Sequence, residues 1–380
     1  MFLVLWFLAM AVGLGTWHHW GTRVLGRRRR AFAVALFALV AVQPVLHWLV
    51  RHSDGRLAGP AQTAALLLLV SLEIAALPIA ALLVLSWAVS RARPAAPRVD
   101  GDTITRRQAV EATGGAAFLA ASGSMLGWGM VRGRHEFQLV ELPVRIAGLP
   151  RTLDGYVIAQ VSDIHAGLYV GERELDEGLA LVRAARPDLV VATGDLVDFE
   201  PSFAPLVARK LADLPARDGV TAILGNHDYY AGAEQVLAAL RAAGIGALVD
   251  EGRQIRGGDG GGFALLGVDD RASVRFGGSG PRLERALSMV PQGLPRILLS
   301  HQPVTVDEWA GQVALQLSGH THGGQINPGV NLADVVFKYV AGVYPVRGTT
   351  LYVNRGFGTV GPPARIGAAP EITRVVLVAA

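Results

Sequence analysis

The segment Val313-Ala314-Leu315-Gln316-Leu317-Ser318-Gly319-His320-Thr321-His322 passes from an apolar, strand-like run into a loop that displays two histidines. Val220 to Leu224 leads in the same way into Gly225-Asn226-His227-Asp228. A glycine ahead of the functional residues lets the backbone turn sharply at the end of a strand. The two loops offer imidazole, carboxamide and carboxylate groups, which are ligands for borderline divalent metals. These segments therefore predict a metal site built on strand ends.

Three further loops of the same kind occur earlier or between these two. Each follows a short apolar run: Asp163-Ile164-His165 follows Tyr156–Val161, Gly194-Asp195-Leu196-Val197-Asp198 follows Leu189–Thr193, and Ser300-His301 follows Arg296–Leu299. Five strand-end loops with metal-ligand chemistry on one chain are difficult to explain as coincidence.

Helix-like segments alternate with the predicted strands. Helical spacing covers Glu172–Ala185, Ser202–Leu214 with an interruption at Pro205, Ala233–Ala243 and Pro281–Met289. Further strands are predicted over His135–Ile146, Phe263–Val268, Thr350–Val353 and Ile372–Val378, and the glycine-rich Arg253–Gly262 predicts a surface turn. Alternation of this kind predicts an α/β fold, in which ligands gather at the carboxyl ends of strands.

Composition and charge separate the chain into two regions. The 380 residues are 51% hydrophobic, and the mean hydropathy of +0.36 is high because of the N-terminal part. Residues 1–134 contain 14 arginines against 5 acidic residues, whereas residues 135–380 contain 21 basic and 26 acidic residues. An acidic second region is a poor match for a polyanion, so we expect no nucleic-acid partner. Cysteine is absent from the sequence, so any metal must be held by oxygen and nitrogen.

Four apolar runs in residues 1–134 predict a transmembrane region with about four helices. They are Phe2–Trp17, Ala31–Val50, Ala64–Val89 and the weaker, Gly/Ala/Ser-rich Gly114–Val131. The second and third runs approach or exceed the length that spans a bilayer. A signal peptide or a buried soluble helix is an alternative for the first and fourth runs.

Arginine placement predicts the orientation of this region. Clusters at Arg27–Arg30 and Arg91–Arg107 follow the first and third runs, and only Arg51 and Arg56 lie between the second and third. The positive-inside rule then places both clusters in the cytoplasm and residues 135–380 on the extracytoplasmic side of a multi-pass cell-membrane protein. The pair Arg106-Arg107 resembles a twin-arginine export signal, or is an ordinary positive flank, and both interpretations predict the same side.

In this order, Asp-x-His, Gly-Asp-x-x-Asp, Gly-Asn-His-Asp, a single His and Gly-His-x-His resemble the calcineurin-like metallophosphoesterases over essentially all of residues 150–380. The segments Gly319–Gln325 and Asn354–Gly358, with Pro363, Arg365 and Pro370-Glu371-Ile372, are similar to the bacterial membrane-anchored branch. The resemblance implies a metallophosphoesterase-type β-sandwich flanked by helices as the catalytic domain, residues 135–380, preceded by the N-terminal transmembrane helical region.

The resemblance also implies a role for each loop. Two divalent metal ions (Mn, Fe or Zn) are expected, with Asp195 bridging them, and a metal-activated hydroxide attacks phosphorus. His227 would contact the phosphoryl or leaving oxygen, Asp228 would orient His227, and Asp198 would support a ligand or cap a helix. The implied ligands are Asp163, His165, Asp195 and His322 for one ion, and Asn226, His301 and His320 with Asp195 for the other.

These expectations favour a membrane-anchored phosphoesterase that hydrolyses a phosphate ester, phosphodiester or pyrophosphate. The expected partners are a phosphorylated small-molecule or lipid substrate and the membrane, with no obligate protein partner. A UDP-diacylglucosamine pyrophosphatase and a non-catalytic metal-dependent sensor are the alternatives. The apolar insert Val330–Val346 is either packed in the core or forms a lip that touches lipid or an acyl substrate.

Overall fold

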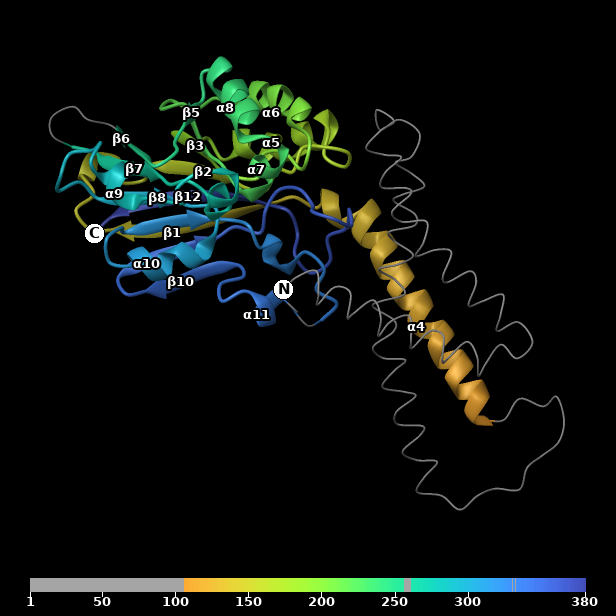
Figure 1. Cartoon of the computed structure of the whole chain (residues 1–380). Coiled ribbons are helices and arrows are strands. Elements are labelled where there is room, and N and C mark those ends of the chain that lie inside the picture. Colours follow the sequence, from red (N-terminus) through yellow and green to blue (C-terminus); the bar gives the residue numbers. More distant parts are fainter. Residues whose placement is uncertain (1–105, 256–260, 330, 332) are drawn as a thin grey trace. The chain divides into compact units, whose positions relative to one another are not determined.

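A computed structural model describes residues 106–255, 261–329, 331 and 333–380 (Figure 1). The chain divides into two units, residues 1–128 and 129–380, which are described separately. The first three apolar runs lie outside the described residues, so the structure gives no information on these predicted crossings.

The fourth apolar run is part of helix α4, Arg106–Val131. Within the described ranges, no helix combines the length and the apolar character needed to cross a membrane. The expected crossing by the fourth run stays a prediction.

Residues 129–380 contain two six-stranded sheets (Figure 1). Neighbouring strands in the first sheet are β1 (Gln138–Ile146), β12 (Glu371–Ala379), β2 (Val157–Val161), β3 (Leu189–Thr193), β4 (Val220–Ile223) and β5 (Gly246–Ala247). In the second sheet they are β10 (Gly342–Val346), β11 (Thr349–Val353), β9 (Leu315–Ser318), β8 (Arg296–Leu299), β7 (Phe263–Gly267) and β6 (Glu251–Ile255).

The two sheets pack face to face through one shared core. Ile158 and Val191 from the first sheet and Leu265, Leu299 and Leu317 from the second are fully buried in it. The alternate residues of the same strands point outward and are also buried, because helices cover both outer faces. Strands that are buried on both faces read as continuous apolar runs, which is how the sequence shows them.

Three helices cover the first sheet and two shorter ones cover the second. Helices α5 (Glu172–Ala184), α6 (Ala204–Ala212) and α8 (Ala233–Ala242) pack against the first sheet. Helices α9 (Leu283–Leu287) and α10 (Val306–Trp309) pack against the second. The predicted α/β architecture of a β-sandwich flanked by helices is therefore confirmed for residues 129–380.

Some local predictions were wrong. Pro205 lies in the first turn of α6 and begins that helix, because a proline there lacks only an N–H that has no helical partner. The predicted turn at Arg253–Gly262 starts inside strand β6, which pairs antiparallel with β7.

The insert 330–346 contains α11 (Ala333–Val336) and strand β10. Its side chains differ in burial, because Tyr339 is buried, whereas Val335 is 85% exposed.

The remaining elements are short. They are α7 (Asn226–Ala231) and the 3₁₀ turns η2 (Gly133–His135), η3 (Arg151–Leu153), η4 (Pro201–Phe203), η5 (Arg271–Phe276), η6 (Pro303–Thr305) and η7 (His322–Gly324). Two of them, α7 and η7, carry predicted site residues at their first positions.

Candidate metal centre and its surroundings

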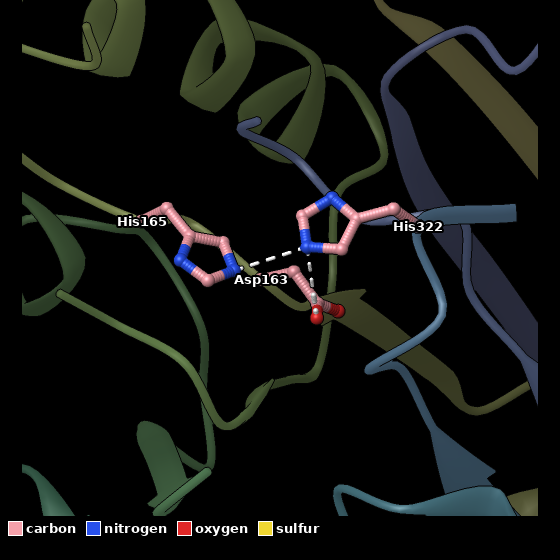
Figure 2. A group of neighbouring side chains, drawn as sticks. All are labelled: Asp163, His165 and His322. Carbon is pink, nitrogen blue, oxygen red and sulfur yellow. Dashed lines mark hydrogen bonds and ion pairs between the residues drawn. The ribbon is translucent and has the colours of Figure 1, made fainter. Parts of the chain in front are cut away.

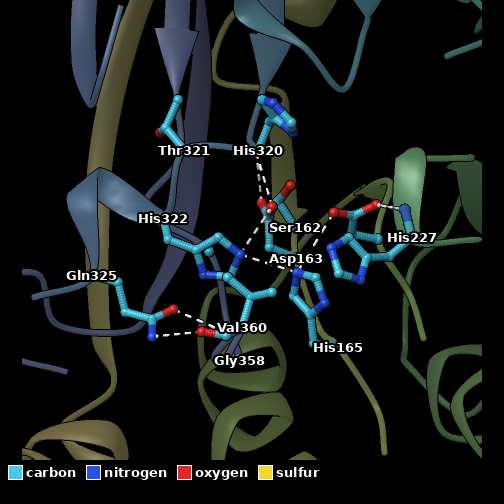
Figure 3. A network of polar contacts seen from close by, with 12 residues as sticks. Ser162, Asp163, His165, His227, His320, Thr321, His322, Gln325, Gly358 and Val360 are labelled. Carbon is cyan, nitrogen blue, oxygen red and sulfur yellow. Dashed lines mark hydrogen bonds and ion pairs between the residues drawn. The ribbon is translucent and has the colours of Figure 1, made fainter. Parts of the chain in front are cut away.

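The predicted site residues follow parallel strands of both sheets. Strands β2, β3 and β4 run parallel in the first sheet, and β8 and β9 run parallel in the second. Their carboxyl ends meet, because the backbone N–H of His320 after β9 donates to the carboxylate of Asp163 after β2. Figure 3 shows side chains from three of the five loops that the sequence singles out, with Asp163, His165, His227, His320 and His322. Asp195 and His301, from the other two loops, lie within ligand distance of this cluster.

One group of potential ligands consists of Asp163, His165 and His322 (Figure 2). His322 Nε2 lies 3.0 Å from His165 Nε2 and 3.5 Å from Asp163 Oδ1. All three side chains are buried. Two imidazoles and a carboxylate that point at one another fit a divalent cation, since nitrogen and oxygen donors of this kind suit Zn, Fe or Mn.

A second group consists of Asp195, His301 and His320, and it is linked to the first. Asp195 Oδ2 lies 3.2 Å from His301 Nε2 and 3.5 Å from His165 Nε2. His320 Nδ1 lies 3.3 Å from His301 Nε2. His165, Asp195 and His227 form a third overlapping group. Asp195 Oδ2 thus faces both His165 of the first group and His301 of the second group.

Asn226 contributes a buried side-chain oxygen that lacks a hydrogen-bond partner among the described residues. The side chain is 8% exposed, and Oδ1 has no hydrogen-bond partner among the described residues. A buried carbonyl oxygen without a hydrogen-bond partner lowers the stability of the folded state, so a bound ion or water is expected next to it. Asn226 follows β4 and stands between Gly225 and His227. The backbone N–H of His227 donates to Asp195 Oδ1 at 2.8 Å. The donor set therefore fits bound divalent metal.

The backbone at the site is held in an unfavourable conformation. Five predicted ligands, with φ values from 50° to 75°, are in the left-handed region: Asp163, His165, Asp195, His320 and His322. Residues with a side chain avoid this region, and such strain concentrates at functional sites. The strained conformation lets successive ligands turn toward the centre from the ends of adjacent strands.

Two glycines are needed because the loops approach each other closely. A Cβ added to Gly225 would overlap the Asp195 carboxylate, and one added to Gly319 would overlap Ser162 Oγ and Asp163 Oδ2. Neither glycine has a positive φ. The sharp turn expected at these positions is therefore not the reason for glycine here. The reason is space for the carboxylates.

Burial and charge set the protonation of the histidines. Burial lowers the pKa of His320 to about 3, so this imidazole is neutral at physiological pH and has a lone pair for a metal. Burial alone would also lower the pKa of His301, but the negative charge of Asp195 outweighs burial and raises it well above the usual range. In the metal-free chain His301 and Asp195 therefore form an ion pair, which a cation would replace.

Contacts outside the ligand groups fix the orientation of two imidazoles. His301 Nδ1 lies 2.8 Å from the carbonyl oxygen of Thr193 and must donate to it, which leaves Nε2 facing Asp195. His227 Nδ1 lies 3.1 Å from both the backbone carbonyl oxygen and the carboxylate Oδ1 of Asp198. Partners of this kind hold the ring and its tautomer in place.

Asp228 has a different partner from the one expected. Its carboxylate accepts hydrogen bonds from the backbone N–H groups of Leu196, Val197 and Gly225 at 2.9, 3.2 and 2.8 Å. It therefore ties the loop after β3 to the loop after β4. Among the described contacts, Asp198 and not Asp228 orients the His227 ring.

Arg365 supports the second histidine loop, a role that sequence reasoning missed. The side chain is 1% exposed and donates to the backbone carbonyl oxygens of His322 at 3.0 Å and Gly358 at 2.9 Å. Burial lowers its pKa to about 9. The sequence pattern around Pro363–Ile372 includes Arg365 and marked it as a residue of interest. Its partner His322 lies 43 residues away in the sequence, so no local pattern predicts the contact.

Known proteins resemble this chain over the same region. The family model for calcineurin-like phosphoesterase matches residues 156–324. The chain is 35% identical over 261 residues to a Danio rerio protein called transmembrane protein with metallophosphoesterase domain, covering 66% of this chain and 59% of that protein. An uncharacterized metallophosphoesterase of Campylobacter jejuni is 34% identical, with 62% of each chain covered. This chain thus spans less than two thirds of the length of these two relatives.

A shorter relative is matched almost completely. The uncharacterized metallophosphoesterase YkuE of Bacillus subtilis is 33% identical over 280 residues, covering 71% of this chain and 96% of that protein. The family match contains all five ligand loops, from Asp163 to His322. The chain therefore belongs to the calcineurin-like phosphoesterase family.

Proposed function

We propose that this protein is a metal-dependent hydrolase of phosphate esters, phosphodiesters or pyrophosphates. The observation that carries the proposal is the buried cluster in which Asp195 joins two groups of imidazole and carboxylate donors. Divalent ions held there would supply positive charge for the phosphoryl oxygens and would lower the pKa of a water molecule to near neutral. Family membership supports the same reaction class.

Two ions fit the distribution of donors best. Asp163, His165 and His322 would hold one, and His301 and His320 would hold the other, with the unpartnered Oδ1 of Asn226 as a further ligand. Asp195 would be shared by both ions. A carboxylate shared by two ions keeps the ions close enough to act on the attacking and leaving oxygens together.

His227 acts on the substrate in this proposal. Burial would lower the pKa of its imidazole, but Asp198 and Asp195 outweigh burial and raise the pKa, which favours the protonated ring. With Nδ1 held by Asp198, Nε2 is the atom free to donate to a phosphoryl or leaving-group oxygen. A positioned donor of this kind stabilises charge that develops during the reaction.

The test is hydrolysis of an aryl phosphate and an aryl phosphodiester by the purified full-length protein in detergent. We expect activity to disappear after removal of divalent metal with a chelator and to return with Mn, Fe or Zn. Activity that persists in protein shown to contain no metal would contradict the proposal. Metal binding with no turnover of any phosphoester would favour the metal-dependent sensor instead.

We also propose that residues 1–134 anchor the enzyme in a cell membrane. The three apolar runs before residue 90 support this, as does the name of the Danio rerio relative. The arginine pattern favours an extracytoplasmic position for the catalytic domain, residues 135–380. A lipid or small-molecule phosphate ester at the membrane surface is the substrate class that this placement favours.

A further inference from the structure

An exposed cluster of aromatic side chains adjoins the candidate centre at His227. Its members are Phe199 in the loop after β3, Tyr230 on α7 and Phe276 in η5, which are 52%, 40% and 55% exposed. We call these three residues the aromatic shelf. Large apolar side chains that gather on a surface usually mark a binding site.

The shelf is continuous with the site. The His227 ring centroid lies 4.8 Å from that of Phe199 and 5.3 Å from that of Tyr230. Phe276 extends the surface, with its centroid 6.2 Å from that of Tyr230. His227 is 9% exposed and belongs with His165 and Asp195 to one candidate ligand group. Any substrate whose phosphorus lies at the cluster therefore has this shelf beside its phosphate.

The geometry of the rings favours a flat occupant. The planes of Phe199 and Tyr230 are inclined by only 13°, with centroids 6.4 Å apart, so the two rings are stacked nearly parallel. Flat π-systems gain from stacking on aromatic faces beyond their buried area, whereas saturated groups gain only from burial.

We propose that the aromatic shelf binds a planar aromatic group on the substrate, attached through the phosphoester, and so determines substrate preference. The group is an aryl ring or a nucleobase, which share the flat π-face that the shelf recognises. This inference rests on the proposed function for the position of the phosphate. It adds the chemical class of the organic part, which the metal cluster itself does not select.

The test compares two phosphonates of similar size that differ in planarity, at a pH at which both are dianions. Dissociation constants of phenylphosphonate and cyclohexylphosphonate are measured by calorimetry on the metal-loaded full-length protein in detergent. We expect phenylphosphonate to bind about five- to tenfold more tightly, because only the flat ring stacks. Phe199→Leu keeps an apolar side chain without a π-face, and it should reduce this preference to near unity. Tyr230→Leu should reduce it as well.

Met289→Ala is the matched control. Met289 is also 52% exposed and lies beyond α9, outside the shelf, so its substitution should leave the phenyl preference unchanged. Equal or tighter binding of cyclohexylphosphonate by the unsubstituted protein would overturn the proposal, and so would a full phenyl preference in folded Phe199→Leu. Failure of both phosphonates to bind the metal-loaded protein would also overturn it.

A second comparison separates the two sources of a flat ring. Adenosine 5′-monophosphate and ribose 5-phosphate share their phosphoester and differ in the base. A KM several-fold lower for the nucleotide, lost in Phe199→Leu, would assign the shelf to a nucleobase. Equal KM values together with a phenyl preference would assign it to an aryl group. Because the phosphonate measurement does not depend on turnover, an inactive protein that retains the phenyl preference would refute the proposed function and not the shelf.

Discussion

Asp195 is the residue on which the two ligand groups depend. Its Oδ2 faces His165 and His301, and its Oδ1 accepts the N–H of His227. Burial would raise the pKa of Asp195, but the positive charge of His301 and its hydrogen bond outweigh burial and lower the pKa. This carboxylate is therefore ionised and ready to bind a cation at any physiological pH.

Asp195→Asn should remove metal from both groups at once. An amide keeps the shape but loses the negative charge that both ions would share, so we expect metal content to fall by more than half. The measurement is elemental analysis of dialysed protein. Asp176→Asn is the control, since that carboxylate lies on α5, is exposed and bonds Lys210. Retention of both ions in Asp195→Asn would exclude the bridging role.

His227→Ala should have the opposite profile. Metal content should stay near normal while kcat falls by about 10²- to 10³-fold, as for the loss of a donor to the transition state. His227 lies within a candidate ligand group, so the measured metal content distinguishes a contact with the substrate from a bond to the metal. Loss of metal in His227→Ala would move the residue into the coordination sphere and change its assignment.

Metal affinity should rise with pH. His301 holds a proton in the metal-free chain, because Asp195 raises the pKa of His301 well above its usual range. A metal must displace that proton, so affinity increases as pH approaches that raised pKa from below. Calorimetry at pH 6, 7 and 8 in two buffers with different ionisation enthalpies measures both the affinity and the protons released. An affinity that is independent of pH, without proton release, would contradict this ion pair.

At the scale of elements, the loops after β2, β3, β4 and β9 pack directly on one another. Gly319 after β9 leaves no room for a methyl group beside Ser162 and Asp163. Asp228 at the start of α7 holds the loop after β3 through two backbone N–H groups. The predicted metal ligands are therefore positioned by contacts between loops and not by each loop alone.

Gly319→Ala should consequently reduce metal binding although it removes no ligand. The added methyl displaces the Asp163 carboxylate or the loop, and overpacking in such a site typically costs about 1–3 kcal/mol. We expect a lower Tm and a loss of metal from the group around Asp163. Gly246→Ala is the control, because a Cβ at that edge-strand position would make only ordinary contacts of 3.5 Å or more. Equal metal content in the two variants would show that the close approach is not needed.

For the whole molecule, we propose that the catalytic domain lies on the extracytoplasmic side of a cell membrane. The arginine clusters at Arg27–Arg30 and Arg91–Arg107 favour cytoplasmic loops. An extracytoplasmic domain then requires Gly114–Val131 to cross the membrane.

Reporter fusions give that measurement. A reporter active only outside the cytoplasm should be active when fused after Ala380 and silent when fused near Asp100, because only the fourth run separates the two positions. The same fusions with a reporter active only in the cytoplasm are the control. Cytoplasmic activity after Ala380 would overturn the extracytoplasmic proposal and would make the UDP-diacylglucosamine pyrophosphatase the leading candidate.

Local sequence was sufficient for the ligand loops and for the class of fold. Each loop combines a short apolar run with a nearby His, Asp or Asn, and such patterns depend on neighbours within about ten residues. The alternation of strands and helices likewise follows from local periodicity and predicts an α/β fold. The sandwich was implied only by the resemblance to the calcineurin-like metallophosphoesterases. Strands such as β6 were missed because Glu251–Ile255 contains little apolar pattern and is held by pairing with β7.

Only the tertiary structure decided which side chains support the ligands. Asp198, and not the adjacent Asp228, contacts His227, because β3 and β4 are neighbours and bring residues 29 positions apart together. Three further features depend on contacts between distant segments in the same way. They are the need for glycine at Gly225 and Gly319, the support of His322 by Arg365, and the aromatic shelf. These features arise where separate segments meet, and such contacts depend on how the sheets pack and not on the residues next in sequence.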